Sequence, residues 1–405
     1  MKNPSKTPLI EGIDLDGRMD RRDALVFTAL ASALALAGCG GGDGGSTVAG
    51  VTSGGTGSFA TGSITGFGSI IVGAIRFDDS KASSVLEIDD DNTDLRGQLR
   101  LGMVVRVKGK PKNGSSADAE TIEVRSELLG PFSRVDATTL SVLGQTVKVT
   151  ATTFFGDGLA GLAALAPNDI VEVHGFVDAV NNVITATRIE RKTLANVKAF
   201  KLQGLVRPLT ANTFQIGNLV ISFAAPIDLP SSLVLANGLL VRVRLAPTLG
   251  SGTRKALKIR AVELEVQDRD EAEVEGTITA FTSSSQFSVN GLAVDASGAV
   301  VPTGLKLGDR VEVEGKLVSG VLVAKKVALD DEKDPLKFEL HGTINSLSTT
   351  AKTFVLRGVT VDYSSTTVEF PNGTVANLRD NVPVEVKGVV SADGTRLKAN
   401  RISFT

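Results

Sequence analysis

Few residues in this chain of 405 have the types and spacing needed for chemistry. Its two histidines, His174 and His341, could in principle act as general bases or metal ligands. His174 lies in a short alternating stretch that recurs along the chain, and the other copies carry Lys108, Arg244, Glu314 and Lys387 at its position. The position of His341 is equally variable. We therefore predict that both histidines are solvated surface side chains, and that there is no catalytic residue and no histidine metal site.

One acidic segment has part of the spacing of a calcium loop. Asp90, Asn92 and Asp94 match its first three ligand positions. Leu95 replaces the glycine that the turn requires, and Leu101 stands where a bidentate acid is needed. A solvated polar loop is the prediction, and a weak calcium site with oxygen ligands is the alternative. No other cofactor is expected.

The single cysteine, Cys39, follows a segment typical of protein export. Arg21-Arg22 precede an apolar run over residues 24–37, which is too short to span a bilayer but suits a signal peptide. Leu36-Ala37-Gly38-Cys39 resembles the bacterial lipobox, which implies lipid attachment at Cys39, and Gly40 favours the outer membrane of a Gram-negative bacterium. A plain secretory signal is the alternative. Translation from Met1 or Met19, and general or twin-arginine export, remain open.

Composition limits the possible partners. The net charge is −2, and aromatic residues make up 4% of the chain, which argues against a nucleic-acid binder. One basic group is predicted to be a solvated sheet face, with an anionic lipid or polysaccharide patch as the alternative: Arg242, Arg244, Arg254, Lys255, Lys258 and Arg260.

The repeated stretch determines the architecture. Val311-Glu312-Val313-Glu314-Gly315 alternates apolar and charged residues, and successive copies start 66, 70, 70 and 73 residues apart, at Val105, Val171, Val241, Val311 and Val384. Alternation predicts that the valines face a core and the intervening residues face outward. A period this regular indicates a repeat protein.

Each repeat reads as five short strands. Turn pairs such as Asn290-Gly291 predict a hairpin between the second and third strands. Leu159–Leu165 could hold one or two helical turns before the fourth strand. A three-strand meander, a connection and a hairpin together predict an all-β tandem array of about five small OB-like barrels. The expected order is a signal peptide at 1–38, a Gly/Ser/Thr-rich tether at 39–60, and barrels at 61–127, 128–195, 196–270, 271–335 and 336–405.

Two of these segments also suggest a family. Residues 62–72 (GSITGFGSIIV) and 101–109 (LGMVVRVKG) resemble the DUF5666 family of bacterial envelope proteins. That family is a domain of unknown function. The resemblance implies export and an all-β repeat, and it transfers no catalytic residue.

The resulting functional hypothesis is a non-enzymatic envelope lipoprotein. Its barrels would form an elongated binding or scaffolding arm, held to the membrane by lipidated Cys39, with a protein or polysaccharide partner and no nucleic acid. The alternatives are an envelope enzyme or polysaccharide-processing factor with a site between barrels, and a calcium-stabilised surface adhesin.

Overall fold

A computed structural model describes residues 58–88, 93–112, 116–156, 158–178, 181–248, 252–262, 267–330 and 338–405. Strands dominate this part of the chain, and the helical elements within it are single 3₁₀ turns such as η4 (Leu162–Ala164), which occupies the expected helical connection. Within these residues no helix is long and apolar enough to cross a membrane. Cys39, Asp90 and Asn92 lie outside the described residues.

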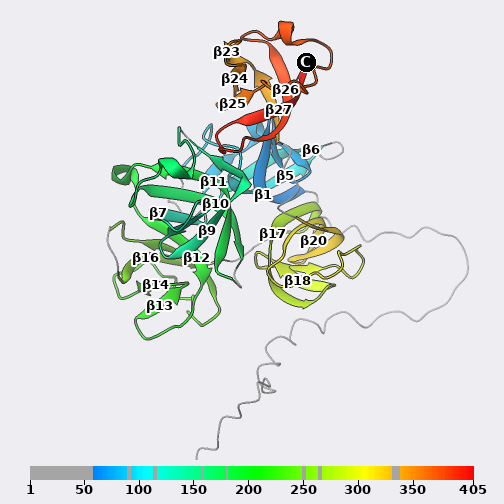
Figure 1. The fold of residues 1–405 in the computed structure, drawn as a ribbon. Helices are drawn as coiled ribbons and strands as arrows, with labels where there is room; N and C mark the ends of the chain where they lie inside the picture. Colours follow the sequence, from blue (N-terminus) through cyan, green and yellow to red (C-terminus); the bar gives the residue numbers. More distant parts are fainter. Residues whose placement is uncertain are drawn as a thin grey trace, which may run out of the picture. The chain divides into compact units, whose positions relative to one another are not determined.

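The strands group into five barrels, numbered here in chain order (Figure 1). Barrel 1 contains β1 (Ser58–Phe67), β2 (Ile70–Val72), β3 (Ile75–Asp78), β4 (Ser84–Glu87), β5 (Val104–Pro111) and β6 (Ser116–Val124). Barrel 2 contains β7 (Leu128–Arg134), β8 (Thr139–Val142), β9 (Gln145–Phe155), β10 (Ile170–Asp178) and β11 (Val183–Lys192). Barrel 3 contains β12 (Phe200–Leu205), β13 (Thr213–Ile216), β14 (Leu219–Ser222), β15 (Leu240–Leu245) and β16 (Arg254–Ala261).

The last two barrels repeat the pattern. Barrel 4 contains β17 (Arg269–Ser283), β18 (Gln286–Val289), β19 (Leu292–Asp295), β20 (Arg310–Val318) and β21 (Val321–Leu329). Barrel 5 contains β22 (Phe338–Thr343), β23 (Asn345–Ser348), β24 (Thr353–Leu356), β25 (Val359–Asp362), β26 (Pro383–Val390) and β27 (Leu397–Phe404).

Strand pairing confirms the predicted OB-like topology. In barrel 2, β7, β8 and β9 form an antiparallel meander, β9 runs parallel to β11, and β10 pairs antiparallel with both β11 and β7. This closes a ring in the order first, second, third, fifth and fourth strand. The predicted hairpin turn is also present, because Asn290 and Gly291 have φ angles of 49° and 85°.

The valines of the repeated stretch lie in the cores, as alternation predicts. Val311 and Val313 are fully buried among the apolar side chains of barrel 4. The cores are not confined to single barrels, however. One apolar cluster includes buried residues of barrels 1 and 5, and a second includes those of barrels 2 and 3.

First strands also pair between barrels. The start of β1 runs parallel to the start of β17, from Ser58 opposite Glu271 to Thr61 opposite Val274. The end of β1 runs parallel to β22, and β7 pairs antiparallel with β12. Barrel 1 therefore contacts barrels 4 and 5, which are distant in sequence. Neighbours in the chain also touch, as barrels 1 and 2 and barrels 2 and 3 do, but the expected elongated arm did not include the contacts of barrel 1 with barrels 4 and 5. These arise because extended first strands offer hydrogen-bonding edges to other barrels.

Phe59 illustrates this exchange between barrels. The sequence predicts residues 58–60 as the end of the Gly/Ser/Thr-rich tether, but they belong to β1. Phe59 is fully buried and packs in the core of barrel 4, beside residues such as Val274 and Val313. Barrel 1 thus supplies a core side chain to barrel 4.

Replacing Phe59 with alanine tests this arrangement. We expect Phe59→Ala to lower the free energy of unfolding by roughly 3–5 kcal/mol, because it leaves a cavity in a core. Amide hydrogen exchange should accelerate in β17 and β20 as well as in β1. Phe214→Ala, in the core of barrel 3, is the matched control and should leave β17 and β20 protected. Unchanged exchange in β17 and β20 of Phe59→Ala would contradict the shared core.

Candidate functional site: the junction of barrels 1, 2 and 3

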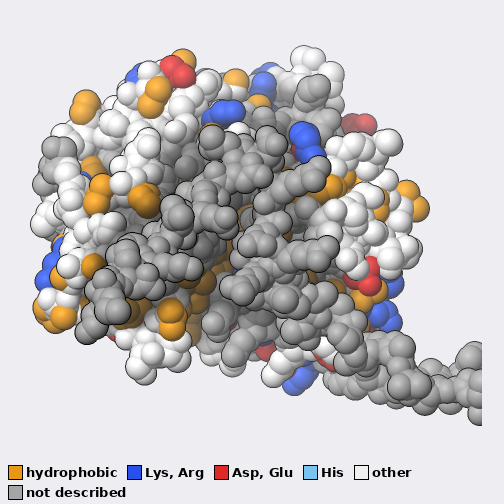
Figure 2. Space-filling view, turned by 90° about the horizontal axis from the view of Figure 1, so that it is seen from below, with side chains coloured by type: hydrophobic (Ala, Val, Ile, Leu, Met, Phe, Trp, Pro, Cys, Tyr) orange, Lys and Arg blue, Asp and Glu red, His pale blue; other side chains and the backbone are white. Residues whose placement is uncertain are grey.

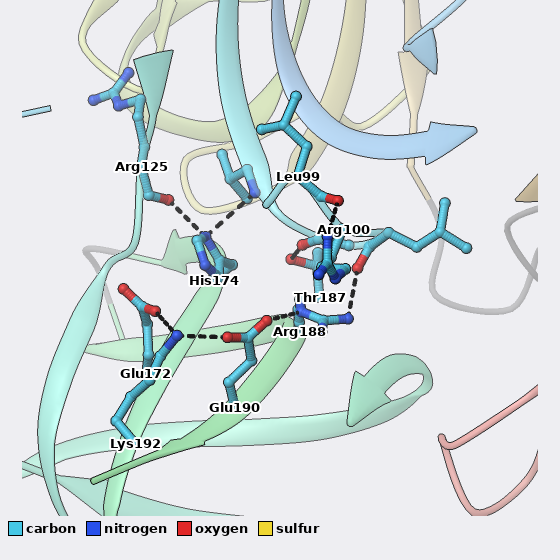
Figure 3. Close-up of polar contacts among 12 residues, drawn as sticks. Leu99, Arg100, Arg125, Glu172, His174, Thr187, Arg188, Glu190 and Lys192 are labelled. Atoms are coloured by element: carbon cyan, nitrogen blue, oxygen red, sulfur yellow. Dashed lines mark hydrogen bonds and ion pairs between the residues drawn. The ribbon is translucent and has the colours of Figure 1, made fainter. Parts of the chain in front are cut away.

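His174 lies at an interface between barrels and not at the surface. Its side chain points out of barrel 2, as alternation predicts, but barrel 1 covers it and leaves it 1% exposed. Nδ1 lies 3.1 Å from the carbonyl oxygen of Arg125 and 3.4 Å from the backbone nitrogen of Val104 (Figure 3). The predicted solvated histidine is therefore wrong, because alternation fixes orientation only relative to a residue's own barrel. Burial lowers the pKa of His174, so the ring is neutral at pH 7.

Four charged side chains of barrel 2 continue this interface. Glu172 and Glu190 are opposite one another on β10 and β11, an arrangement of like charges that is unfavourable alone. Lys192 Nζ lies 2.8 Å from Glu172 Oε2 and 2.6 Å from Glu190 Oε2, and Arg188 donates to the other oxygen of Glu190 (Figure 3). Glu190 is 1% exposed, and the two cations compensate its burial.

Strand β11 of barrel 2 also donates hydrogen bonds to barrel 1. Arg188 Nη1 donates to the carbonyl oxygen of Leu101 at 3.1 Å, and Thr187 Oγ1 donates to that of Gly102 at 2.6 Å. Leu101 and Gly102 lie just before β5, the strand that carries the repeated stretch of barrel 1. Barrel 2 therefore binds the loop that leads into β5.

Barrel 3 joins the junction through Lys201 of β12. Lys201 is in contact with Glu87 of barrel 1 and lies 3.8 Å from Glu172 of barrel 2. Burial, together with Arg244 and Arg242, lowers the pKa of Lys201 to about 7, whereas its contact with Glu87 favours the charged form. Three barrels thus each contribute a charged group to one cluster.

A cavity of about 480 Å³ opens beside this cluster. Barrel 1 contributes Glu87, Arg100 and Met103 to its wall, and barrel 2 contributes Glu172, His174, Glu190 and Lys192. The segment between barrels 2 and 3, with barrel 3 itself, adds Asn196, Lys198, Lys201 and Arg244. We take this cavity as the candidate ligand site because charged groups from three barrels converge there.

The interface between barrels 1 and 4 is also built on carboxylates. Glu275 Oε2 accepts hydrogen bonds from Ser63 N at 3.0 Å and Ser63 Oγ at 3.2 Å. Glu273 accepts the Ala74 N–H at 2.7 and 2.8 Å, in the hairpin turn of barrel 1. That turn has Gly73 at φ 59°, and a Cβ there would lie 2.1 Å from a Glu273 oxygen. The glycine at position 73 thus lets the carboxylate of Glu273 lie close to the backbone of this turn.

Arg310 of barrel 4 binds groups in two barrels. Its guanidinium lies 2.5 Å from Glu275 Oε1 and 2.7 Å from Asp330 Oδ2. The same group lies over the ring of Phe176 in barrel 2, with 4.3 Å to the centroid. A cation in this position offsets part of the buried negative charge of barrel 4.

His341 belongs to a third cluster, between barrels 1 and 5. Its Nε2 lies 2.6 Å from Glu339 Oε1 and 3.8 Å from Glu385 Oε2, and its side chain is 30% exposed. These three residues could together hold a metal ion. Their carboxylates already pair with cations, since Arg76 of barrel 1 lies 2.5 Å from Glu339 and Lys387 lies 3.1 Å from it. The prediction that His341 is a solvated surface side chain is therefore wrong, because it is half-buried in an ion-pair cluster.

Two other groups singled out in the sequence, the acidic segment with Asp94 and the basic group of barrel 3, lie outside these clusters. Asp94, of the suggested calcium loop, is exposed, and its carboxylate accepts the Arg96 N–H at 2.8 Å. The basic group of barrel 3 is not a uniformly solvated face, because Arg254 is 8% exposed and lies 5.9 Å from the ring centroid of Phe200. Arg260 is paired with Asp228.

The sequence analysis missed most residues of the junction. Arg188, Glu190, Lys192 and Lys201 were not singled out, because each occupies an outward position whose type varies between repeats. One signal in the sequence could have indicated contacts between barrels. Outward positions in different repeats carry opposite charges, as Lys201 and Glu172 do, and oppositely charged positions can pair across an interface.

Glu190 gives the barrel 1–2 interface a dependence on acid. Burial alone would raise the pKa of Glu190, but Arg188 and Lys192 outweigh it and lower the pKa to about 2. Because the unfolded pKa is 4.5, the carboxylate's contribution of about 3 kcal/mol is present above pH 4.5 and is lost as the pH falls toward 2. The advantage of wild type over Glu190→Gln in urea unfolding should shrink across that window. Glu120→Gln, a more exposed change, should show no such trend, and a constant advantage would contradict the assignment.

Glu273 gives the barrel 1–4 interface the opposite dependence. Burial, then the hydrogen bond and charge of Glu312 and the charge of Glu314, raise the pKa of Glu273 to about 9. The native state then holds a proton that the unfolded state loses above pH 4.5, so stability falls as the pH rises from 4.5 to 9. The glutamine of Glu273→Gln stays neutral at every pH, so the melting temperature of this variant should depend less on pH between 4.5 and 9 than that of wild type. Glu369→Gln, on an exposed side chain, is the control; parallel profiles for Glu273→Gln and wild type would contradict this pKa.

Comparisons with known proteins identify the repeated unit. The family model of the domain of unknown function DUF5666 matches residues 130–190, 275–328 and 341–403, which fall in barrels 2, 4 and 5. No curated protein matches the sequence. A solved structure of drosophila Unr CSD456 aligns with 16% identity and a TM-score of 0.14, covering 51% of this chain and 96% of that one. The DUF5666 model thus matches three of the five barrels, which agrees with a domain that is repeated along the chain.

Proposed function

We propose that this chain is a non-enzymatic lipoprotein of the Gram-negative cell envelope, whose joined barrels act as a binding or scaffolding arm. The observation that carries the proposal is the position of the buried ionisable groups. Glu190, Glu273, Glu275 and His174 lie at junctions between barrels. There they hold one barrel against another through ion pairs and hydrogen bonds, which is a structural use of charge.

The distribution of side chains on the surface supports binding through charged and apolar contacts together. On the described surface in view, Figure 2 shows basic, acidic and hydrophobic side chains interspersed, without separation into one charged face. A nucleic-acid binder instead concentrates Lys and Arg on one face. The net charge of −2 and the aromatic content of 4% of the whole chain support a protein or polysaccharide partner in the envelope and no nucleic acid.

Attachment to the membrane rests on Cys39. The lipobox-like sequence Leu36-Ala37-Gly38-Cys39 supports diacylglycerol transfer to its sulfur, and Gly40 supports sorting to the outer membrane. A single acyl chain gives only marginal membrane binding, whereas a multiply acylated cysteine anchors stably.

Substitution of Cys39 tests the anchor. In a Gram-negative host, the wild-type chain should incorporate labelled fatty acid and fractionate with the outer membrane. Cys39→Ala should lose the label and leave the membrane fraction, because the chain has no other cysteine to acylate. Ser46→Ala is the matched control. Retention of label or of membrane association by Cys39→Ala would contradict the proposal.

Capture experiments test the scaffolding role. The full chain should retain a stoichiometric component from envelope extracts, and Phe59→Ala should retain less of it because the barrel 1–4 contact is weakened. Retention of nothing by the wild-type chain, or equal retention by the variant, would contradict a role for the joined barrels.

A further inference from the structure

The cavity at the junction of barrels 1, 2 and 3 has the size of a ligand site. Its volume is about 480 Å³, within the range of roughly 300–1,000 Å³ that small-molecule pockets occupy. Three barrels contribute its walls, so it exists only when they are joined.

The charges that line the cavity are unequal. Six Lys or Arg and three Glu border it, a surplus of three basic residues. The inner lysines, Lys192 and Lys201, contact the glutamates. Nearer the surface, Arg100 Nη1 donates to the carbonyl oxygens of Gly97 and Leu99, and Lys198 is exposed. Arg191 is exposed as well and lies 3.7 Å from Asp169, which offsets part of its charge. The excess positive charge therefore lies at the mouth, where it favours an anionic group.

The inner wall offers hydrogen bonds instead. His174 lines the cavity, and within the described residues its buried Nε2 has no hydrogen-bond partner. If Nδ1 donates to Arg125, Nε2 is a free acceptor; if Nδ1 accepts from Val104, Nε2 is a free donor. A hydroxyl group satisfies either tautomer because it both donates and accepts. The carboxylate of Glu172, which is 8% exposed, can accept a further hydroxyl, whereas both oxygens of Glu190 are already engaged by Arg188 and Lys192.

We propose that this cavity binds an acidic saccharide, with the acid at Arg100, Arg191 and Lys198 and the hydroxyls at His174 and Glu172. The residues that line it include no aromatic side chain, so stacking on a sugar ring is not available. Binding then depends on charge and hydroxyl contacts together, and is weakened by salt. The inference rests on the proposed binding function and names its ligand class.

Calorimetry with the full-length chain tests this site. The probe is a galacturonate trimer, and the comparison ligands are a galactose trimer and inorganic phosphate. We expect binding of the galacturonate trimer, at least tenfold weaker binding of both comparison ligands, and at least tenfold weakening in the double variant Arg191→Gln/Lys198→Gln. Lys316→Gln/Lys325→Gln, which removes two exposed charges from barrel 4, should bind as wild type does.

Three results would overturn the proposal: no heat with the galacturonate trimer, equal binding of phosphate, or unchanged affinity in Arg191→Gln/Lys198→Gln. Equal binding of the galactose trimer would overturn the requirement for an acid. These outcomes are separate from the anchor test, since Cys39 lipidation and capture of an envelope component can succeed when saccharide binding fails.

Discussion

Charge removed from water requires an opposite charge or a full set of hydrogen bonds, and this constraint determines how the five barrels associate. Each barrel offers outward side chains on its first strand and on the strand of the repeated stretch that pairs with it. Where another barrel covers them, they are neutralised by that barrel, as Lys201 is by Glu87 and Glu339 by Arg76. Because five similar folds could dock in many combinations, charge matching favours the correct pairs, since a wrong pair would bury unpaired charge.

Apolar contacts stabilise the same interfaces. Phe154 of barrel 2 meets Phe338 of barrel 5 edge to face, with ring centroids 4.8 Å apart, and Phe59 of barrel 1 completes the core of barrel 4. In a solenoid each repeat contacts only its neighbours, so stability is nearly a sum of local terms. Here barrel 1 contacts barrels 2, 4 and 5, and damage to one barrel is therefore transmitted to others distant in sequence.

The fold within each barrel was predictable from sequence because its signals are local. Alternation placed Val311 and Val313 in the core, and Asn290-Gly291 marked a hairpin. The association of barrels was not predictable, because a residue's outward orientation does not reveal what lies outside. His174 was expected in solvent and Phe59 in a tether, and both are buried by another barrel. Equivalent outward positions carry different charges in different repeats. Comparison of the repeats therefore did not identify Glu190 or Lys201 as part of a junction.

The pairing of β1 with β17 has a consequence for biogenesis. Ser63 and Glu275 are 212 residues apart in the chain, so β1 is synthesised long before the strand that covers it. Contacts of such sequence separation form late and slowly. During synthesis, Phe59 and the free edge of β1 remain uncovered until barrel 4 has been made. A chain truncated before residue 269 would keep that edge exposed, which offers proteases and chaperones a direct sign of an incomplete chain.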